Sequence, residues 1–559
     1  MHFLGAALTM LGVAAEKCTL LPEHTFEPGS PGYLARVPVY NKALAHNSPG
    51  TIYAANSTAD VARAVCAATA EGLEIRVRAG GHSFTGESTC SGAACLQIDL
   101  TAMRGTNFDA ASGIATVGPG ARSMDVYAAL DPLGVTVVTG SCLPVGFGGL
   151  ALGGGYGLLS REHGLAADRI VGMELVLPNA TVASVDAAHN PELYWALRGG
   201  GHANFGIVTS FRVRTVDTSK DVFQFRLFTP SDAAAAPQAL VAWQALAATA
   251  DRRVHTQFSM TNYRSGPPGF NIIFQYNGTT AEADALFRAS GLLAFVAPAE
   301  CAAGKANPVN GSAEPPLPWG CDDMPYAHVH ELVGYCGFET DRGFAAHSRF
   351  LAEPLSLAHA TALWDAFRAI HNDTYGCVPQ WADLMFDAFG GAIADVAPAG
   401  TAFPHRGALA QLQYNVFWDG PTAPKGCVEW LDGLYTASSD FLPDASYVNY
   451  PSAELVDYGT SYFGANYVRL QKLKAAIDPA GAFAYPQSIQ PAGSDPTPAP
   501  APSPPAPPAP APAEPTPAPG AYCGKDAADA ARRCDQPCAH PGDCTQPGDT
   551  NCFNGITCT

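Results

Sequence analysis

The sequence predicts an α+β protein with a small disulfide-rich module at its C-terminus. From residue 50 to 217, short strands alternate with short helices, separated by turns such as Pro178-Asn179. From 218 to about 440, strand-like segments (FQFRLFT, FNIIFQYNG, LAQLQYNVFW) alternate with amphipathic helical ones (PQALVAWQALAATA, TALWDAFRAIHN). This second pattern indicates an antiparallel sheet backed by helices. Six cysteines then fall within residues 522–559, and a segment that short needs disulfides to fold.

Composition limits the class of protein. A chain of 559 residues is longer than one ordinary domain and predicts three or four units, and 47% apolar residues suffice for a sizeable core. The net charge of −19 argues against a nucleic-acid surface, because phosphate binding needs clustered Lys and Arg. That charge suits an enzyme acting on neutral substrates, and we expect no membrane span.

The N-terminus and the cysteines point to secretion. Residues 1–15 contain a short apolar segment that ends in Val-Ala-Ala, which is typical of a signal peptide, although a buried first strand or helix is the alternative. The 16 cysteines are too many for an ordinary enzyme of a reducing compartment. Five glycosylation sequons point the same way, at Asn56, Asn179, Asn277, Asn310 and Asn372. We therefore expect an extracellular glycoprotein.

Two glycine-rich stretches carry the candidate chemistry. A strand in which Leu73, Ile75 and Val77 alternate with charged residues runs into Gly80-Gly81, followed by His82. Glycines there let backbone N–H groups approach a ligand and form a concavity that binds anions. The second stretch, GSCLPVGFGGLALGGGYG from residue 140 to 157, offers backbone that can lie against a planar ring. Either stretch alone is equally consistent with an ordinary turn, and no GxGxxG supports a Rossmann fold.

Taken together and in this order, the two stretches resemble a known family. RxGGHS at 78–83 and CxxVG at 142–146 are similar to motifs of the berberine-bridge-enzyme-like oxidases, within the vanillyl-alcohol-oxidase-like flavoproteins. The stretches YVNY, YFGANYVRL and FAYPQSI, between residues 445 and 489, resemble the C-terminal signature of that family. The run LYWALRGGGHANFGIVT departs from the family pattern, because His202-Ala203 interrupts its glycines.

The resemblance implies a division of the chain into six parts. These are a signal peptide (1–15), a PCMH-type FAD-binding domain of two subdomains (16–217), a substrate-binding domain (218–444), a berberine-bridge segment that completes the FAD domain (445–490), a Pro/Ala-rich linker (491–521) and a cysteine-rich module (522–559). The linker composition favours an extended polyproline II tether. The module is similar to small modules of other secreted enzymes, which implies that it binds a polysaccharide. Metal binding is its alternative, although only one histidine accompanies the cysteines, and we predict no metal site.

The resemblance also implies the cofactor, FAD, with two covalent attachments. In the family, the histidine that matches His82 bonds to the 8α-methyl group of the flavin, and the cysteine that matches Cys142 bonds to its C6. From the residues alone, Cys142 would by default be half of a disulfide. The predicted cofactor-binding residues are Arg78, Ala79, Gly80, Gly81, His82, Ser83, Phe84, Gly86, Cys142, Val145, Gly146, Gly149, Gly154, Gly155, Gly157, Ile207, Tyr462 and Asn466.

The catalytic predictions combine strand alternation with the family motifs. Alternation places Gln411, Gln413 and Asn415 on one face of a strand, which is either exposed or lines a polar pocket. In the family this strand lies over the flavin, with Gln or Glu at the position of Gln413. Tyr450 of YVNY matches the base of the carbohydrate and alcohol oxidases, and Asp387 of FDAFGG matches an assisting carboxylate. Asp387 is otherwise an ordinary loop carboxylate. We expect Tyr156 of GGGYG in the same cavity.

These features predict a secreted FAD-linked oxidoreductase. It takes a hydride from a hydroxyl-bearing carbon of a carbohydrate or alcohol, and O2 accepts the electrons and gives H2O2. The family resemblance favours O2 because the small Val145 leaves it room beside the flavin. One alternative is an oxidase of an aromatic or alkaloid secondary metabolite, and another is a catalytically silent glycan-binding surface protein. We expect a monomer that has no nucleic-acid or membrane partner.

The disulfide predictions differ in their origin. The family resemblance implies Cys18–Cys66, whereas Cys90 and Cys95 are close enough in sequence to close a short loop. A free buried thiol is the alternative for each of these four. The pairing stays open for Cys301, Cys321, Cys336, Cys377 and Cys427. Because five is an odd number, at least one of them is free or pairs outside this set.

Overall fold

A computed structural model describes residues 18–493, apart from 265, 298–319, 325–341 and 373, together with the strands 520–524 and 551–556. The predicted signal peptide and most of the predicted linker and module lie outside the described residues. The chain divides into two compact units, residues 1–496 and 497–559. In the second unit, β20 (Gly520–Gly524) and β21 (Asn551–Ile556) pair antiparallel, with Cys523 opposite Cys552 in the register. The disulfides of the module stay a prediction.

The first unit begins with a four-stranded sheet that carries the first glycine-rich loop. Its order is β1-β2-β4-β3, and β4 runs parallel to both β2 and β3. The bounds are β1 (Thr25–Phe26), β2 (Pro49–Ala54), α2 (Thr58–Glu71), β3 (Glu74–Arg78) and β4 (Gly92–Asp99). Helix α2 begins at Ser57, whose hydroxyl accepts from the backbone N–H of Asp60, and ends at the left-handed Gly72. The disulfides Cys18–Cys66 and Cys90–Cys95 confirm both predicted pairings.

A second, antiparallel sheet with order β5-β6-β10-β8-β9 completes the N-terminal part. The bounds are β5 (Thr106–Asp109), β6 (Ile114–Val117), β8 (Ile170–Val176), β9 (Val182–Val185) and β10 (Ile207–Arg214). The strands β8 and β9 pair antiparallel. Short helices lie around this sheet and connect it to the loops of the site: α3 (Ser123–Leu130), α4 (Phe147–Leu152), α5 (Ser160–His163), α6 (Ala166–Arg169) and α7 (Pro191–Ala196).

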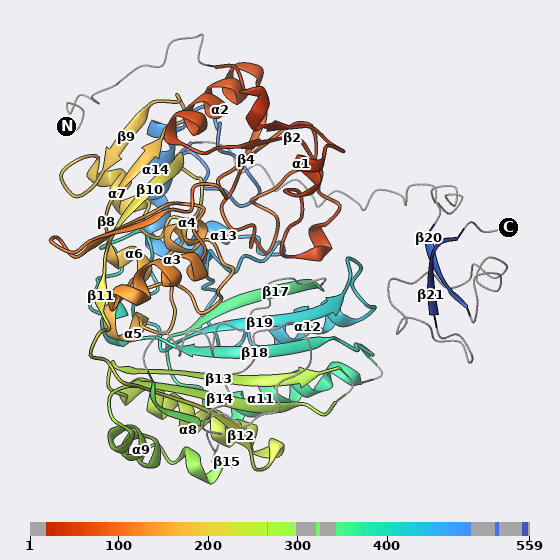
Figure 1. The fold of residues 1–559 in the computed structure, drawn as a ribbon. Helices are drawn as coiled ribbons and strands as arrows, with labels where there is room; N and C mark the ends of the chain where they lie inside the picture. Colours follow the sequence, from red (N-terminus) through yellow and green to blue (C-terminus); the bar gives the residue numbers. More distant parts are fainter. Residues whose placement is uncertain are drawn as a thin grey trace. The chain divides into compact units, whose positions relative to one another are not determined.

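The C-terminal segment of the first unit returns to this sheet. Figure 1 shows α14 (Tyr467–Ile477, blue) beside β10 (yellow), although the two are far apart in the sequence. Leu470 of α14 and Tyr462 of α13 (Tyr458–Phe463) belong to the same buried apolar cluster as Phe211 of β10. The buried Lys474 donates hydrogen bonds to Asp478 at 2.8 Å and to the carbonyl of Asn204 at 2.6 Å. This segment therefore completes the core around the second glycine-rich stretch.

Residues 223–419 form a large antiparallel sheet, as predicted. Its order is β15-β12-β14-β13-β18-β19-β17, with β16 paired to β12. The bounds are β12 (Phe223–Pro230), β13 (Val254–Tyr263), β14 (Gly269–Asn277), β15 (Val296–Ala297), β16 (Gly320–Met324), β17 (Arg342–Leu351), β18 (Trp381–Ala388) and β19 (Ala410–Asp419). Three helices cover one face: α8 (Ala236–Thr249), α11 (Leu357–Arg368) and α12 (Cys427–Ala437). Trp243, Leu363 and Trp430 of these helices share one core with the apolar side of the sheet.

Buried arginines fix the large sheet against the N-terminal part. Arg161 of α5 donates to backbone carbonyls of α8 and of the strand that follows, at 2.7 Å for Val254 and 3.3 Å for Ala247. Arg406 donates two hydrogen bonds of 2.7 Å to the carboxylate of Asp168, and both side chains are buried. Removing one partner of such a pair would leave a buried charge uncompensated, so these contacts fix the site geometry. Among the described residues, no helix has the length and apolarity that a membrane span requires.

Candidate active site

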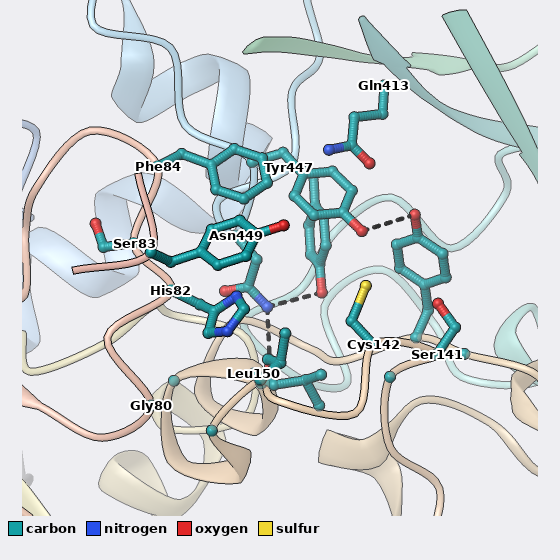
Figure 2. A pocket seen from close by; sticks show the side chains of 18 of the residues that line it. Gly80, His82, Ser83, Phe84, Ser141, Cys142, Leu150, Gln413, Tyr447 and Asn449 are labelled. Atoms are coloured by element: carbon teal, nitrogen blue, oxygen red, sulfur yellow. Dashed lines mark hydrogen bonds between the residues drawn. The ribbon is translucent and has the colours of Figure 1, made fainter. Parts of the chain in front are cut away.

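A cavity of about 660 Å³ lies between the two glycine-rich loops and the face of the large sheet that the helices leave uncovered. Predicted cofactor-binding residues on its wall are Ala79, Gly80, Gly81, His82, Ser83, Phe84, Cys142, Val145, Gly146, Gly149, Gly157 and Ile207. The four predicted catalytic residues line it as well, namely Tyr156, Asp387, Gln413 and Tyr450. Figure 2 shows His82 and Cys142 entering from the two loops and Gln413 from the sheet. Segments far apart in the sequence therefore meet at one cavity.

Six predicted cofactor-binding residues lie outside the lining of this cavity. They are Arg78, Gly86, Gly154, Gly155, Tyr462 and Asn466. Arg78 donates to the carbonyl of Arg36. The N–H of Gly155 donates to the hydroxyl of Tyr447 at 2.9 Å, and the Asn466 amide donates to the carbonyl of Pro398 at 2.8 Å. These contacts hold Arg78, Gly155 and Asn466 in the loops around the cavity.

The two glycine-rich loops touch each other through their backbones. A Cβ atom added to Gly80 would lie 2.3 Å from the backbone nitrogen of Gly146, so a side chain at this position would push the loops apart. Gly81 has a φ of +73°, a conformation that L side chains rarely adopt. A Cβ atom added to Gly149, in contrast, would meet no atom within 4 Å. The loops thus present bare backbone to the cavity, and this surface fits the flat ring and phosphates of a flavin nucleotide.

His82 is held as a neutral imidazole at the wall of the cavity. Its ring stacks on Tyr40, with the ring centroids 4.0 Å apart. Burial, together with the charges of Arg78 and Arg122, lowers the pKa of His82 to about 3. A neutral imidazole keeps a lone pair on one ring nitrogen, so His82 can form a bond to carbon at neutral pH.

Cys142 is disulfide-bonded in this structure. Its partner is none of the six cysteines of the pairs Cys18–Cys66, Cys90–Cys95 and Cys377–Cys427. A sulfur atom in a disulfide cannot also bond to a flavin, and the two states of Cys142 therefore exclude each other. The described pairs include Cys377–Cys427, which joins two of the five cysteines that the sequence left unassigned.

Tyr450, Tyr156 and Asp387 form a hydrogen-bonded chain in the cavity. The hydroxyls of Tyr156 and Tyr450 are 3.1 Å apart, and Tyr156 donates to Asp387 Oδ2 at 3.0 Å or to Gln411 Oε1 at 2.8 Å. Gln257 donates to the second oxygen of Asp387 at 2.9 Å. Phe84 stacks on Tyr450, with the ring centroids 5.3 Å apart. The arrangement can carry a proton from Tyr450 to a carboxylate that neighbouring residues hold in place.

The pKa values assign the direction of that proton movement. Burial, followed by the charge of Asp387, raises the pKa of Tyr450. Burial also raises the pKa of Asp387 to about 6, although the hydrogen bonds from Gln257 and Tyr156 work against it. At neutral pH the carboxyl of Asp387 is therefore mostly ionised and accepts a proton, whereas Tyr450 alone holds its own proton tightly.

Sequence reasoning missed several residues of the cavity. Asp383 lies on β18 on the same face as Asp387, and Asn449 and Tyr447 lie beside Tyr450. The hydroxyl of Tyr447 accepts from the amide of Asn449 at 2.9 Å, a contact that Figure 2 shows. Strand alternation, which placed Gln411, Gln413 and Asn415 on one face, would have paired Asp383 with Asp387 if it had been applied to the segment 381–388.

An aromatic row crosses the sheet at one end of the cavity. The strand register places Tyr263 opposite Trp381 and Trp381 opposite Phe417, while Phe417 faces Phe344 on β17. The Trp381 and Phe417 rings are stacked, with centroids 5.0 Å apart. Asp387 and Gln257 lie six residues along their strands from this row, which is about 20 Å at 3.3 Å per residue. The cavity wall is therefore polar near Asp387 and aromatic at the row. The ring of Phe84 lies between the row and Tyr450, with its centroid 4.8 Å from that of Phe344 and 5.3 Å from that of Tyr450.

Comparison with known proteins identifies relatives across most of the chain. Residues 49–186 match the family described as "FAD binding domain", and residues 446–490 match "Berberine and berberine like". Aclacinomycin-N/aclacinomycin-A oxidase of Streptomyces galilaeus is 31% identical over 488 residues, which are 80% of this chain and 86% of that protein. Carbohydrate oxidase of Microdochium nivale is 28% identical over 493 residues, which are 83% of this chain and 92% of that protein.

The fold has solved relatives as well. The structure of Physcomitrella patens BBE-like 1 superposes with a TM-score of 0.72 at 27% identity, over 83% of this chain and 96% of that one. The fold, the glycine-rich loops and the sequence matches agree on a cavity for FAD. On these grounds the chain belongs to the berberine-bridge-enzyme-like family of FAD-linked oxidoreductases.

Proposed function

We propose that this protein is a secreted oxidase that takes a hydride from a hydroxyl-bearing carbon of a carbohydrate or alcohol and passes the electrons to O2, giving H2O2. The chain of hydrogen bonds from Tyr450 through Tyr156 to Asp387 is the observation that carries the proposal. It supplies the base that removes the proton of a substrate hydroxyl. The carbohydrate oxidase of Microdochium nivale supports a sugar as the substrate.

The base works as a relay. The phenol oxygen of Tyr450 accepts the hydroxyl proton of the substrate while Tyr450 gives its own proton to Tyr156, and Tyr156 gives its proton to Asp387. The raised pKa of Tyr450 disfavours its phenolate form, but the relay does not need a free phenolate, because Tyr450 gives up one proton as it accepts another. The carboxylate of Asp387 loses its negative charge when it receives the proton. Gln257 orients this carboxylate by donating a hydrogen bond to it, and Gln411 orients the hydroxyl of Tyr156 by accepting one from it.

Bound FAD would supply the acceptor for the hydride and the route of the electrons to O2. The backbone of the two glycine-rich loops would hold the cofactor, and His82 would attach it covalently. The predicted second attachment, at Cys142, needs the sulfur that the structure places in a disulfide, so it stays a prediction. Val145 lines the cavity beside Gly146, where a small side chain leaves room for O2.

The location of the protein is part of the proposal. Disulfides such as Cys377–Cys427 and Cys18–Cys66 persist in an oxidising compartment, which supports secretion. We propose that the protein is a monomer and that residues 522–559 bind a polysaccharide, which keeps the enzyme close to its sugar substrate.

Peroxide release from a panel of substrates tests the proposal. Purified protein is incubated in air with mono- and oligosaccharides, simple alcohols and polycyclic aromatic compounds, and H2O2 is quantified with a coupled peroxidase. We expect turnover of at least one sugar or alcohol at a kcat of roughly 1–10³ s⁻¹. Turnover of the aromatic compounds alone would support an oxidase of an aromatic secondary metabolite instead. No reduction of the flavin by any compound would support a silent glycan-binding protein.

The second candidate, an oxidase of an aromatic secondary metabolite, has its own support. The row of Trp381, Phe417 and Phe344 offers rings on which a planar substrate can stack. The relative with 31% identity is an aclacinomycin oxidase. The polar residues near Tyr450 favour a sugar at the place where oxidation occurs, and this is why the carbohydrate comes first.

The relay predicts a pH dependence that belongs to Asp387. Because the pKa of Asp387 is about 6, its carboxyl is protonated and blocked below that pH, and kcat should rise as the pH increases through 6. In Asp387→Asn no carboxylate accepts the proton, so kcat should fall about 10²–10⁴-fold and the rise near pH 6 should disappear. Steady-state peroxide assays from pH 4.5 to 8 measure both effects. Asp395→Asn, at an exposed carboxylate that pairs with Arg252, is the control and should keep the wild-type profile.

A further inference from the structure

One motif of the sequence has no part in the proposed relay. It is the loop from residue 199 to 206, between α7 and β10, in which His202 and Ala203 interrupt a run of glycines. Both residues line the cavity. The interruption therefore brings an imidazole to the cavity wall where the family pattern has glycine, and the relay from Tyr450 to Asp387 does not use it.

Hydrogen bonds hold the backbone of this loop in place. The carbonyl of His202 accepts from the hydroxyl of Tyr485 at 2.8 Å. Two residues further on, the amide of Asn204 donates to the carbonyl of Gly200 at 2.9 Å. Ala203 has a φ of +51°, a left-handed conformation that an L residue adopts only where the surrounding contacts impose it. The backbone that carries His202 is therefore fixed independently of a ligand.

The two ring nitrogens of His202 have different surroundings. Nδ1 is buried and has no hydrogen-bond partner among the described residues. Nε2 has no partner among them either, but it is exposed to the cavity that the ring lines. Because Nδ1 makes no hydrogen bond that sets the tautomer, the group that meets Nε2 decides which nitrogen carries the proton. An acceptor on the ligand places the proton on Nε2, and the ring then donates to that acceptor.

The charges near His202 place it on the side of the cavity that the first glycine-rich loop forms. The charge that acts on its imidazole is that of Glu87, and the carboxylate of Glu87 accepts a hydrogen bond from the hydroxyl of Ser83. Ser83 closely follows Gly80-Gly81, where backbone N–H groups form a concavity that binds anions. Asp387 is not among the groups whose charges act on His202. His202 therefore lies at the part of the cavity that fits the cofactor, away from the relay.

The cavity wall offers little positive charge to the phosphates of FAD. No Lys or Arg is among the described residues that line it, although the charges of Arg78 and Arg122 act on His82. Burial lowers the pKa of His202, and the carboxylate of Glu87, which does not line the cavity, opposes this effect. Both phosphates of FAD are negatively charged, and their oxygens only accept hydrogen bonds. A phosphate at Nε2 would therefore meet a donor, and its charge would favour the protonated ring.

We propose that Nε2 of His202 donates a hydrogen bond to a phosphate oxygen of FAD. This inference rests on the FAD site of the proposed function and is independent of the substrate. The backbone N–H groups of the glycine-rich loops supply uncharged donors, and His202 adds a side-chain donor that can carry a positive charge. His202 is therefore a cofactor-binding residue that this chain has in place of a glycine of the family pattern.

The test measures binding in the full chain with His82→Ala, from which the flavin can be removed. Cys142→Ser is added if colour stays with the chain. Calorimetry gives the Kd of the flavin-free protein for FAD, for ADP-ribose, which has the pyrophosphate without the flavin, and for riboflavin, which has the flavin without the pyrophosphate. Adding His202→Ala should raise the Kd of FAD and of ADP-ribose about tenfold or more and leave that of riboflavin unchanged.

Two further variants are compared in the same background. His202→Gln keeps a side-chain N–H donor, so its Kd for FAD and ADP-ribose should lie between that of the parent protein and that of His202→Ala. His46→Ala removes an exposed imidazole and should bind all three compounds as the parent protein does. The melting temperature of each flavin-free variant separates a loss of binding from a loss of fold.

The outcomes separate this inference from the proposed function. If the parent protein binds FAD but His202→Ala changes no Kd, or weakens riboflavin as much as ADP-ribose, the assignment of His202 is wrong and the proposed function stands. If the parent protein binds neither FAD nor ADP-ribose, the FAD site fails and this inference fails with it. No substrate enters these measurements, so an error in the proposed substrate class does not affect their result.

Discussion

Tyr450→Phe is expected to remain fully yellow and to lose nearly all of its activity. Phenylalanine keeps the aromatic ring that stacks on Phe84 but removes the hydroxyl through which the relay passes the proton of the substrate to Tyr156 and Asp387. The loss of a general base typically costs 10²–10⁴-fold in rate, and we expect a fall in kcat of that size. The variant is mixed rapidly with substrate in the absence of oxygen, and the decrease in flavin absorbance gives the rate at which the substrate reduces the flavin.

The control for this variant is Tyr458→Phe, which removes a hydroxyl that bonds the backbone of Ser488 outside the cavity. It should be reduced by substrate at the wild-type rate. Dithionite should reduce the flavin of both variants, because that reaction needs no protein base. If Tyr450→Phe were reduced by substrate as fast as the wild type, the relay through Tyr156 would be wrong.

His82→Ala should bind FAD reversibly and release it when the protein is denatured. The wild-type imidazole is neutral and held against Tyr40, so it can form the bond to the flavin, whereas alanine cannot. After acid precipitation, we expect the flavin of the variant in the supernatant and that of the wild type in the pellet. His46→Ala, at an exposed imidazole near the N-terminus, should behave as the wild type.

The same measurement decides the state of Cys142. If Cys142 remains in a disulfide, the precipitate of His82→Ala is colourless. If Cys142 also bonds to the flavin, that precipitate stays yellow, and only the double variant His82→Ala with Cys142→Ser loses the colour. Retention of colour in the double variant would contradict both attachments.

Local patterns in the sequence predicted strands β12, β14 and β19, helices α8 and α11, and the face of β19 that enters the cavity. The alternation of Gln411, Gln413 and Asn415 with apolar residues needs no tertiary information, and neither does the turn between β8 and β9. The alternation did not show whether this polar face of β19 is exposed to solvent or lines a cavity. The answer depends on which loops cover the face, and these loops carry Tyr156 and Tyr450 from two distant parts of the sequence.

The rest of the site depends on contacts that no spacing encodes. Gly154 and Gly155 belong to the same glycine run as Gly157, yet only Gly157 lines the cavity. Gly154 lies beside the ring of Phe403, and the N–H of Gly155 donates to Tyr447. Two disulfides were predicted and are present, Cys18–Cys66 and Cys90–Cys95, but the count of cysteines did not indicate that Cys377 pairs with Cys427.

Acid precipitation of the wild-type protein, followed by mapping of the flavin-containing peptide, tests whether His82 attaches FAD covalently. We expect a yellow precipitate and a peptide in which the flavin is bonded to His82 beside Gly80 and Gly81. A protein that is colourless after production with ample riboflavin, or that releases all its flavin on denaturation, would contradict it.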